Sequence, residues 1–188
     1  MFDPSGPVLG IDPGLSRCGY GAVHPDGGQP RAVAFGILST PLGDPLPDRL
    51  AALEADLTAL VAEVGPRAMA VERVLFQANV RTAISVGQAS GIALAVASRA
   101  GIPVTHYSPN EVKLAVTGFG AAAKAQVQVM VQRLLGLATA PPPDAADALA
   151  LAMCHGSSAR TTEAVGDTPP GRGFEAAVAA AMAREGAR

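Results

Sequence analysis

The sequence predicts an α/β domain built on a five-stranded mixed sheet, in the order 3-2-1-4-5, flanked by helices. Three observations lead to this prediction. Short apolar runs bounded by turn residues predict strands, and apolar residues at helical spacing predict helices. The first three strands are separated only by short turns. Each of the two later strands is instead preceded by a helix.

The chain opens with three strands joined by tight turns. Residues 8–12 form an apolar run that ends in a carboxylate, and the turn residues Pro13-Gly14 follow it. The second strand is predicted over residues 19–24 and the third over residues 31–40. Because short turns join them, these three strands must run antiparallel to one another.

Two units of helix followed by strand come next. In each, a glycine ends the helix and a short apolar strand follows, which predicts helices at 47–64 and 82–100 and strands at 68–72 and 103–107. Right-handed crossovers place the fourth strand beside the first and the fifth beyond it. The order 3-2-1-4-5 follows from these connections.

Three helices complete the predicted domain. Ser108-Pro109 begins the first, with serine as the N-cap and proline at the first helical position. Apolar residues over 127–135 predict the second, and residues 144–155 the third. We therefore expect one domain over residues 1–156 and a mobile C-terminal tail over residues 157–188.

Composition excludes several classes of protein. With 188 residues, 49% hydrophobic and only 16% charged, the chain is an ordinary globular domain and not a disordered protein. Its two cysteines, Cys18 and Cys154, are too few for a disulfide framework and lack metal-ligand spacing. No secretory signal pattern opens the chain. These features predict a cytoplasmic protein with reduced cysteines.

The longest uncharged stretch covers residues 82–98 and is 17 residues long. A membrane-spanning helix needs roughly 20 apolar residues, so this stretch is interpreted as a buried helix and no membrane association is expected. Gly87 and Gly91 lie on one face of it. Small residues at this spacing permit close helix packing, either within one molecule or between two copies.

The net charge of −2 conceals an uneven distribution. Residues 67–133 contain seven basic and two acidic residues, whereas the segments on either side are acidic. A basic segment of this kind is typical of a phosphate-facing surface, although charge alone does not distinguish such a surface from an ordinary solvated face.

Four carboxylates occupy apolar or proline-rich surroundings. Asp12 and Glu72 end the two adjacent parallel strands, where the order of the sheet reverses and ligands commonly bind. Asp144 and Asp147 are three residues apart in the first turn of one helix. Each alone could be a turn or cap residue. Together they would repel one another strongly unless cations held them.

Such a cluster of oxygen ligands suits Mg²⁺ or Mn²⁺ better than zinc. Two such ions roughly 3.5–4 Å apart can stabilise the attacking and leaving oxygens of a phosphoryl displacement. The chemistry that fits these residues is therefore phosphodiester hydrolysis.

Four sequence motifs in order resemble those of the RuvC Holliday-junction resolvases, which have a ribonuclease H-like fold with the predicted sheet order. The first is GIDPGLSRCGYG at residues 10–21, and the second is Ala70-Val71-Glu72 followed by residues 86–91. The third is the segment that carries Lys113 and Lys124, and the fourth is DAADALA at residues 144–150. The first motif alone is weak, but all four in order are specific, and they span about residues 8–155.

The resemblance implies a homodimer that resolves four-way DNA junctions by paired symmetric nicks in homologous recombination and DNA repair. It implies cooperation with the branch-migration proteins RuvA and RuvB. The four carboxylates Asp12, Glu72, Asp144 and Asp147 would then hold two Mg²⁺ or Mn²⁺ ions in each active site. Lys113 and Lys124 would contact phosphate or stabilise charge near the reacting strand.

One position departs from the family pattern. The family commonly has an aromatic residue three positions after the glutamate, where it stacks at the junction; here that position is Leu75, and Phe76 follows it. Either Phe76 takes the stacking role or Leu75 acts as an apolar wedge. The neighbouring Arg73 and Arg81 are further candidate DNA contacts.

Two other functions remain open on the sequence. One is a different ribonuclease H-like nuclease that acts on single-stranded DNA or RNA. The other is a junction-binding module without catalytic activity, against which the full set of acids argues, because buried carboxylates without a metal are destabilising. An actin-like kinase needs a duplicated domain and far more than 188 residues.

Overall fold

The computed structural model describes residues 6–25, 29–73 and 80–165, except for the side chains of Arg81 and of the residues after Ser157. The chain divides into two compact units, Met1–Ser157 and Ser158–Arg188. The sheet lies in the first unit. Residues 166–188 are outside the described part, so the C-terminal tail proposed for 157–188 stays a prediction.

The described strands form one five-stranded sheet in the order β3-β2-β1-β4-β5, which confirms the predicted topology. β1 pairs antiparallel with β2, and β2 with β3; β1 pairs parallel with β4, and β4 with β5. The strands are β1 Val8–Asp12, β2 Arg17–His24, β3 Arg31–Ser39, β4 Ala68–Glu72 and β5 Val104–Tyr107.

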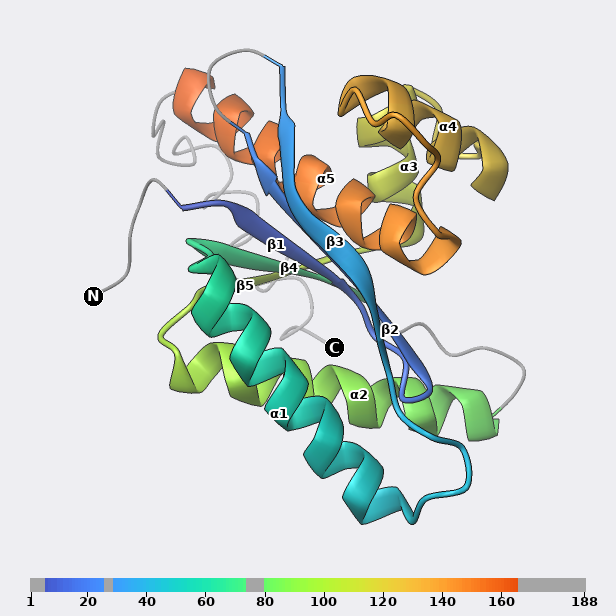
Figure 1. The fold of residues 1–188 in the computed structure, drawn as a ribbon. Helices are drawn as coiled ribbons and strands as arrows, with labels where there is room; N and C mark the ends of the chain where they lie inside the picture. The colour runs from blue at the N-terminus through green and yellow to red at the C-terminus, as the bar shows by residue number, and fades with distance from the viewer. Residues whose placement is uncertain (1–5, 26–28, 74–79, 166–188) are drawn as a thin grey trace, which may run out of the picture. The chain divides into compact units, whose positions relative to one another are not determined.

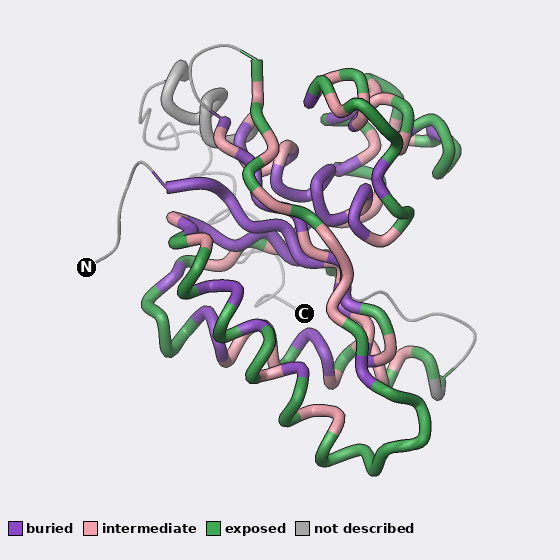
Figure 2. Tube along the Cα trace, in the orientation of Figure 1, coloured by how far each residue is buried: buried purple, intermediate pink, exposed green. Residues whose placement is uncertain are grey.

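Helices cover both faces of the sheet (Figure 1). α1 and α2 pack on one face, and α5 crosses the other, with α3 and α4 beside it. Buried residues follow the strands and the inner faces of the helices in two apolar layers, one on each side (Figure 2). The helices are α1 Leu46–Val64, α2 Val80–Arg99, α3 Pro109–Thr117, α4 Lys124–Leu134 and α5 Pro143–Val165.

The parallel register brings two of the predicted acids to one edge. Ile11 is opposite Val71, so the residues that follow them, Asp12 and Glu72, end adjacent strands side by side. Glu72 in turn is opposite Tyr107 at the end of β5. The carboxyl ends of β1 and β4 therefore form the floor of a crevice, as the switch point in strand order predicts.

Glycines on β1 and β2 let α5 lie unusually close to the sheet. A Cβ atom at Gly10 would lie 1.9 Å from the Ala148 carbonyl oxygen, and one at Gly19 would lie 2.1 Å from that of Asp144. Both clashes would be with backbone atoms, so the movement of a neighbouring side chain could not relieve them. The glycines thus hold the first turns of α5 directly against the strand that follows Asp12.

Two expectations from the sequence need correction. α2 is buried on one face only: Ala89, Ala93 and Ala97 pack in the core, whereas Gly87 and Gly91 are exposed and a Cβ at either would meet no atom within 4 Å. α5 does not end at residue 155 but continues to Val165. Gly156 therefore lies within the helix, and its lack of a side chain allows a close approach to Pro25, whose Cβ would lie 2.7 Å from a Cβ at that position.

Within the described residues, none of the helices combines the length and the apolar character that crossing a bilayer requires.

Candidate active site

Two carboxyl groups meet at the ends of β1 and β4. Asp12 and Glu72 are half-buried, and a hydrogen bond joins their side chains. Burial, together with the nearby charges of Glu72 and Asp147, raises the pKa of Asp12 to about 7. The pKa of Glu72 is also raised, first by burial and then by Asp147. Both carboxyl groups therefore bind a proton more tightly than ordinary carboxyls do.

α5 brings the other two acids to the same edge, each paired with a basic side chain. Arg17 Nε donates to Asp144 Oδ2 at 2.7 Å, and Lys124 Nζ contacts Asp147 Oδ2 at 2.5 Å. The hydrogen bond to Asp147 raises the pKa of Lys124. The pKa of Asp147 is nevertheless raised, because burial outweighs the effect of the lysine.

A pocket of about 190 Å³ opens between these elements. Its charged lining residues are Glu72 from β4, Lys113 from α3, and Lys124 and Asp147 from α4 and α5, and the others are apolar. Asp12 and Asp144 do not line this pocket, but both act electrostatically on the groups around it. The structure therefore brings both predicted lysines to the predicted carboxylates.

The start of α3 is fixed by a capping box, which sets the position of Lys113. Ser108 Oγ accepts the Glu111 backbone N–H at 3.4 Å, and Glu111 Oε2 accepts the Ser108 backbone N–H at 2.7 Å. The Ser108 hydroxyl also donates to Glu111 Oε2 at 2.6 Å, and this bond, followed by the one from the Ser108 backbone N–H, lowers the pKa of Glu111. Glu111 is thus an acid near the pocket with a structural role of its own.

The donor set can be tested for its fit to a metal. Four carboxylates with no histidine or cysteine among them are ligands for a hard divalent cation. Among the residues that the structure describes, no three acidic, histidine or cysteine side chains are already arranged around one point as metal ligands. Asp144 and Asp147 instead pair with Arg17 and Lys124. The chemistry of the donors fits a divalent cation, and the ion pairs to Arg17 and Lys124 each involve one oxygen, Oδ2, of these two acids.

The remaining predicted DNA contacts are only partly visible. Arg73 follows β4, its side chain is exposed, and its backbone N–H donates to the Tyr107 carbonyl at 2.8 Å. Arg81 lies in the first turn of α2, but its side chain is outside the described part. Leu75 and Phe76 lie outside the described residues altogether.

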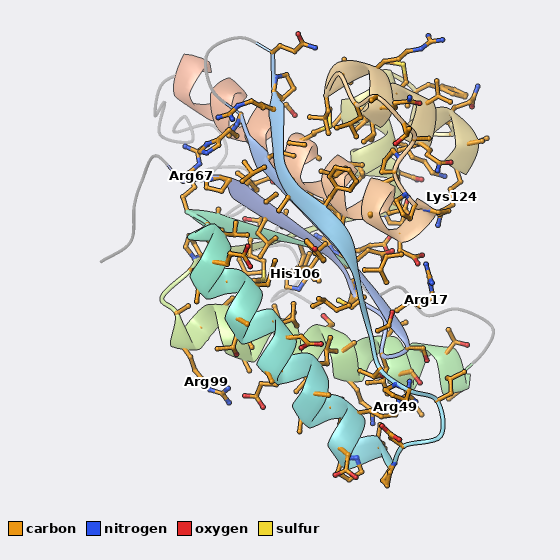
Figure 3. The ribbon with its side chains drawn as sticks, viewed as in Figure 1. Arg17, Arg49, Arg67, Arg99, His106 and Lys124 are labelled. Carbon is orange, nitrogen blue, oxygen red and sulfur yellow. The ribbon has the colours of Figure 1, made fainter. Side chains whose placement is uncertain are left out.

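The basic residues fall at two ends of the unit (Figure 3). Arg17 and Lys124 lie at the end with the carboxylates, whereas Arg67 and Arg99 lie at the opposite end. Sequence reasoning did not identify Arg17 as the partner of Asp144, 127 positions away. The one sequence feature that could have pointed to Arg17 was its position in the motif that contains Asp12.

Comparison with known proteins agrees with this arrangement. The family model described as crossover junction endodeoxyribonuclease RuvC matches residues 8–155. A protein of that description from Salinispora arenicola is 57% identical over 150 residues, which cover 79% of this chain and 86% of the relative. Another from Chloroflexus aggregans is 51% identical over 160 residues, covering 85% and 98%.

Solved structures give the same result. The structure of Thermus thermophilus RuvC in complex with a Holliday junction substrate matches with a TM-score of 0.79 and 38% identity, covering 83% of this chain and 96% of that chain. The yeast mitochondrial Holliday junction resolvase, at 16% identity and a TM-score of 0.59, shares the fold. With the four motifs, the sheet order and these matches together, the chain belongs to the RuvC family of crossover junction endodeoxyribonucleases.

Proposed function

We propose that this protein resolves four-way DNA junctions by paired, symmetric nicks through metal-dependent hydrolysis of phosphodiester bonds. The observation that carries the proposal is the approach of Lys113 and Lys124 to two half-buried carboxylates, Glu72 at the end of β4 and Asp147 in α5. Acids that hold cations and lysines that contact phosphate are the groups that such a hydrolysis needs. The Holliday junction substrate of the Thermus relative supports the choice of DNA.

Asp12, Glu72, Asp144 and Asp147 would hold two Mg²⁺ or Mn²⁺ ions per active site. When bound, these ions would supply an activated water and neutralise charge on the reacting phosphate. The pocket walls position the scissile phosphate beside Glu72 and Asp147. Lys113 and Lys124 direct their ammonium groups to the phosphate oxygens that gain charge in the transition state.

The DNA contacts extend from this pocket along the basic segment. Arg73 and Arg81 would bind phosphates next to the reacting strand. Phe76, or Leu75 in its place, would stack at the junction centre. Most of the affinity is expected from the basic contacts to phosphate, so it should fall steeply with salt.

Two nicks on opposed strands need two active sites, which a homodimer provides. A stripe of exposed residues follows one face of α2 at helical spacing: Val80, Ile84, Gly87 and Gly91. Exposed apolar side chains next to glycines that admit a close partner helix suit packing between two copies. An Ile84→Asp variant should therefore sediment as a monomer, and a variant that stays dimeric would rule this face out.

The same proposal includes a place in the cell and in a pathway. We place the protein in the cytoplasm, in homologous recombination and DNA repair, acting with the branch-migration proteins RuvA and RuvB. The support for these statements is membership of the RuvC family.

A single assay tests the activity. A labelled four-way junction, a matched linear duplex, single-stranded DNA and RNA are each incubated with the protein in Mg²⁺, Mn²⁺ or EDTA. We expect paired symmetric nicks confined to the junction and dependent on the metal. Equal cutting of single strands or RNA would favour a different nuclease. Junction binding in EDTA with no cutting after Mg²⁺ is restored would indicate a binding module.

A further inference from the structure

A hydrogen-bonded network at the start of α1 reaches the turn that follows Asp12. Arg49 Nη2 donates to Ser16 Oγ at 2.8 Å, and Arg49 Nε donates to Thr40 Oγ1 at 3.0 Å. Thr40 Oγ1 in turn donates to the Leu15 carbonyl oxygen at 2.6 Å. Thr40 is only 5% exposed, and Arg49 and Ser16 are half-buried, so this network is anchored in the interior.

The turn held by this network is tight and leads directly to the ion pair at Asp144. Leu15 is buried in the apolar layer beneath α1 and α2, and a Cβ at Gly14 would lie 2.3 Å from the Arg17 carbonyl oxygen. Ser16 is followed at once by Arg17, whose Nε binds Asp144. Figure 3 shows Arg49 and Arg17 at the same end of the unit.

We propose that Arg49 is a positioning residue of the active site: through Ser16 and Thr40 it fixes the turn Leu15-Ser16-Arg17, and thereby the guanidinium that orients Asp144. The effect on metal rests on the proposed function, in which Asp144 is a metal ligand. Outer groups that orient a metal's carboxylate ligands commonly change its affinity, so the effect of Arg49 should reach the site without contact with substrate.

A second arginine that joins α1 to another segment, Arg99, provides a matched control. Arg99 pairs with Glu54 of α1, but at the opposite end of the unit and on the surface. Arg49→Ala and Arg99→Ala therefore both remove one positive charge and an arginine contact between α1 and another segment. Only Arg49→Ala removes hydrogen bonds that hold the turn after Asp12. A role limited to anchoring α1 would make the two variants alike.

The first arm of the experiment follows the Arg17 Nε–H signal by NMR in the protein without metal, with Arg17→Ala to assign it. We expect a hydrogen-bonded signal in the wild type and in Arg99→Ala. In Arg49→Ala it should move to the position of a solvent-exposed arginine, and Arg49→Lys should recover it in part. If Arg49→Ala does not fold, as judged by its melting curve, Ser16→Ala replaces it and should weaken the same signal. An unchanged signal in a folded variant overturns the proposal.

The second arm measures Mn²⁺ binding by electron paramagnetic resonance, and single-turnover cleavage with saturating protein. Arg17→Ala and Arg49→Ala should each weaken Mn²⁺ binding about 10-fold, the lower end for loss of an orienting group. The double variant should match Arg17→Ala alone, because both changes act through one contact. Additive losses would overturn the proposal.

The two arms separate the inference from the proposed function. If the wild type binds Mn²⁺ but cuts no junction, the function is wrong, while the NMR signal and the non-additive binding still test the role of Arg49. If cleavage is normal and Arg49→Ala behaves as Arg99→Ala does, only the inference is wrong.

Discussion

Charged side chains are half-buried at one end of the sheet and lie on the surface at the other. At the carboxyl ends of β1 and β4, half-buried acids gather, and burial with the neighbouring acids raises the pKa of Asp12 to about 7. At the other end Arg99 pairs with Glu54 on the surface, where such a pair contributes about 0–1 kcal/mol. Burying charge is costly unless it is paired. The unfavourable burial of negative charge is therefore concentrated at one edge of the sheet, where a divalent cation could offset it.

The largest expected effect comes from removing the acids at that edge. Asp12→Asn, Glu72→Gln and Asp147→Asn should each abolish cutting, while junction binding stays near normal, because affinity comes chiefly from basic contacts to phosphate. Cleavage assays and filter binding in EDTA measure the two separately. Loss of binding in parallel with loss of cutting would indicate that the acids serve folding instead.

The next largest effect is expected on the cleavage rate, when basic residues at the two ends of the sheet are replaced. Lys113→Ala and Lys124→Ala should slow single-turnover cleavage by about 10²–10³, the typical effect of one preorganised contact to transition-state charge. Arg67→Ala and Arg99→Ala each remove one positive charge as well, but should leave this rate unchanged. Equal rate losses at both ends would show that the lysines do not act at the reacting phosphate.

Two glycines that contact other segments closely allow the same two ends of the sheet to be compared by substitution. α5 approaches the sheet closely at Gly19, beside Asp144, and at Gly156, beside Pro25. Either glycine changed to alanine should destabilise the fold by about 1–3 kcal/mol, the usual range for overpacking. Denaturant titration measures this loss. Only Gly19→Ala should also slow cleavage, because its Cβ would displace the Asp144 backbone; an equal slowing by Gly156→Ala would contradict that reason.

The smallest expected effect is on stability as a function of pH. The pKa of Asp12 is raised from 3.8 to about 7 in the folded protein, so its protonated form stabilises the fold, fully below about pH 4. That stabilisation is lost as the pH rises toward 7 and above. In EDTA at pH 8, Asp12→Asn should therefore melt about 2–4 °C above the wild type, the shift expected for about 1 kcal/mol.

Calorimetry of both proteins at pH 4 and pH 8 measures this difference. At pH 4 the two melting temperatures should approach each other, and Mg²⁺ at pH 8 should raise that of the wild type alone. A wild type that melts higher than Asp12→Asn in EDTA at pH 8 would show that the Asp12 carboxylate is stabilising without metal.

The sequence by itself determined the sheet and the acids at its edge. Strand order follows from turn lengths and the handedness of crossovers, which are local or topological rules, and these rules suffice to place Asp12 and Glu72 side by side. The spacing of Asp144 and Asp147 placed both on one turn of a helix. The strand order needed only the connections between elements and their handedness, and the placement of Asp144 and Asp147 needed only residues near one another in the chain.

The tertiary structure alone decided which side chains meet. Arg17 and Asp144 are 127 positions apart, and nothing in either segment names the other as its partner. The exposure of Gly87 and Gly91 depends on which elements cover α2, and the close approach of Gly156 to Pro25 depends on where α5 packs. Periodicity and turn chemistry report on neighbouring residues. Contacts between distant segments depend on how whole elements pack, which no local pattern encodes.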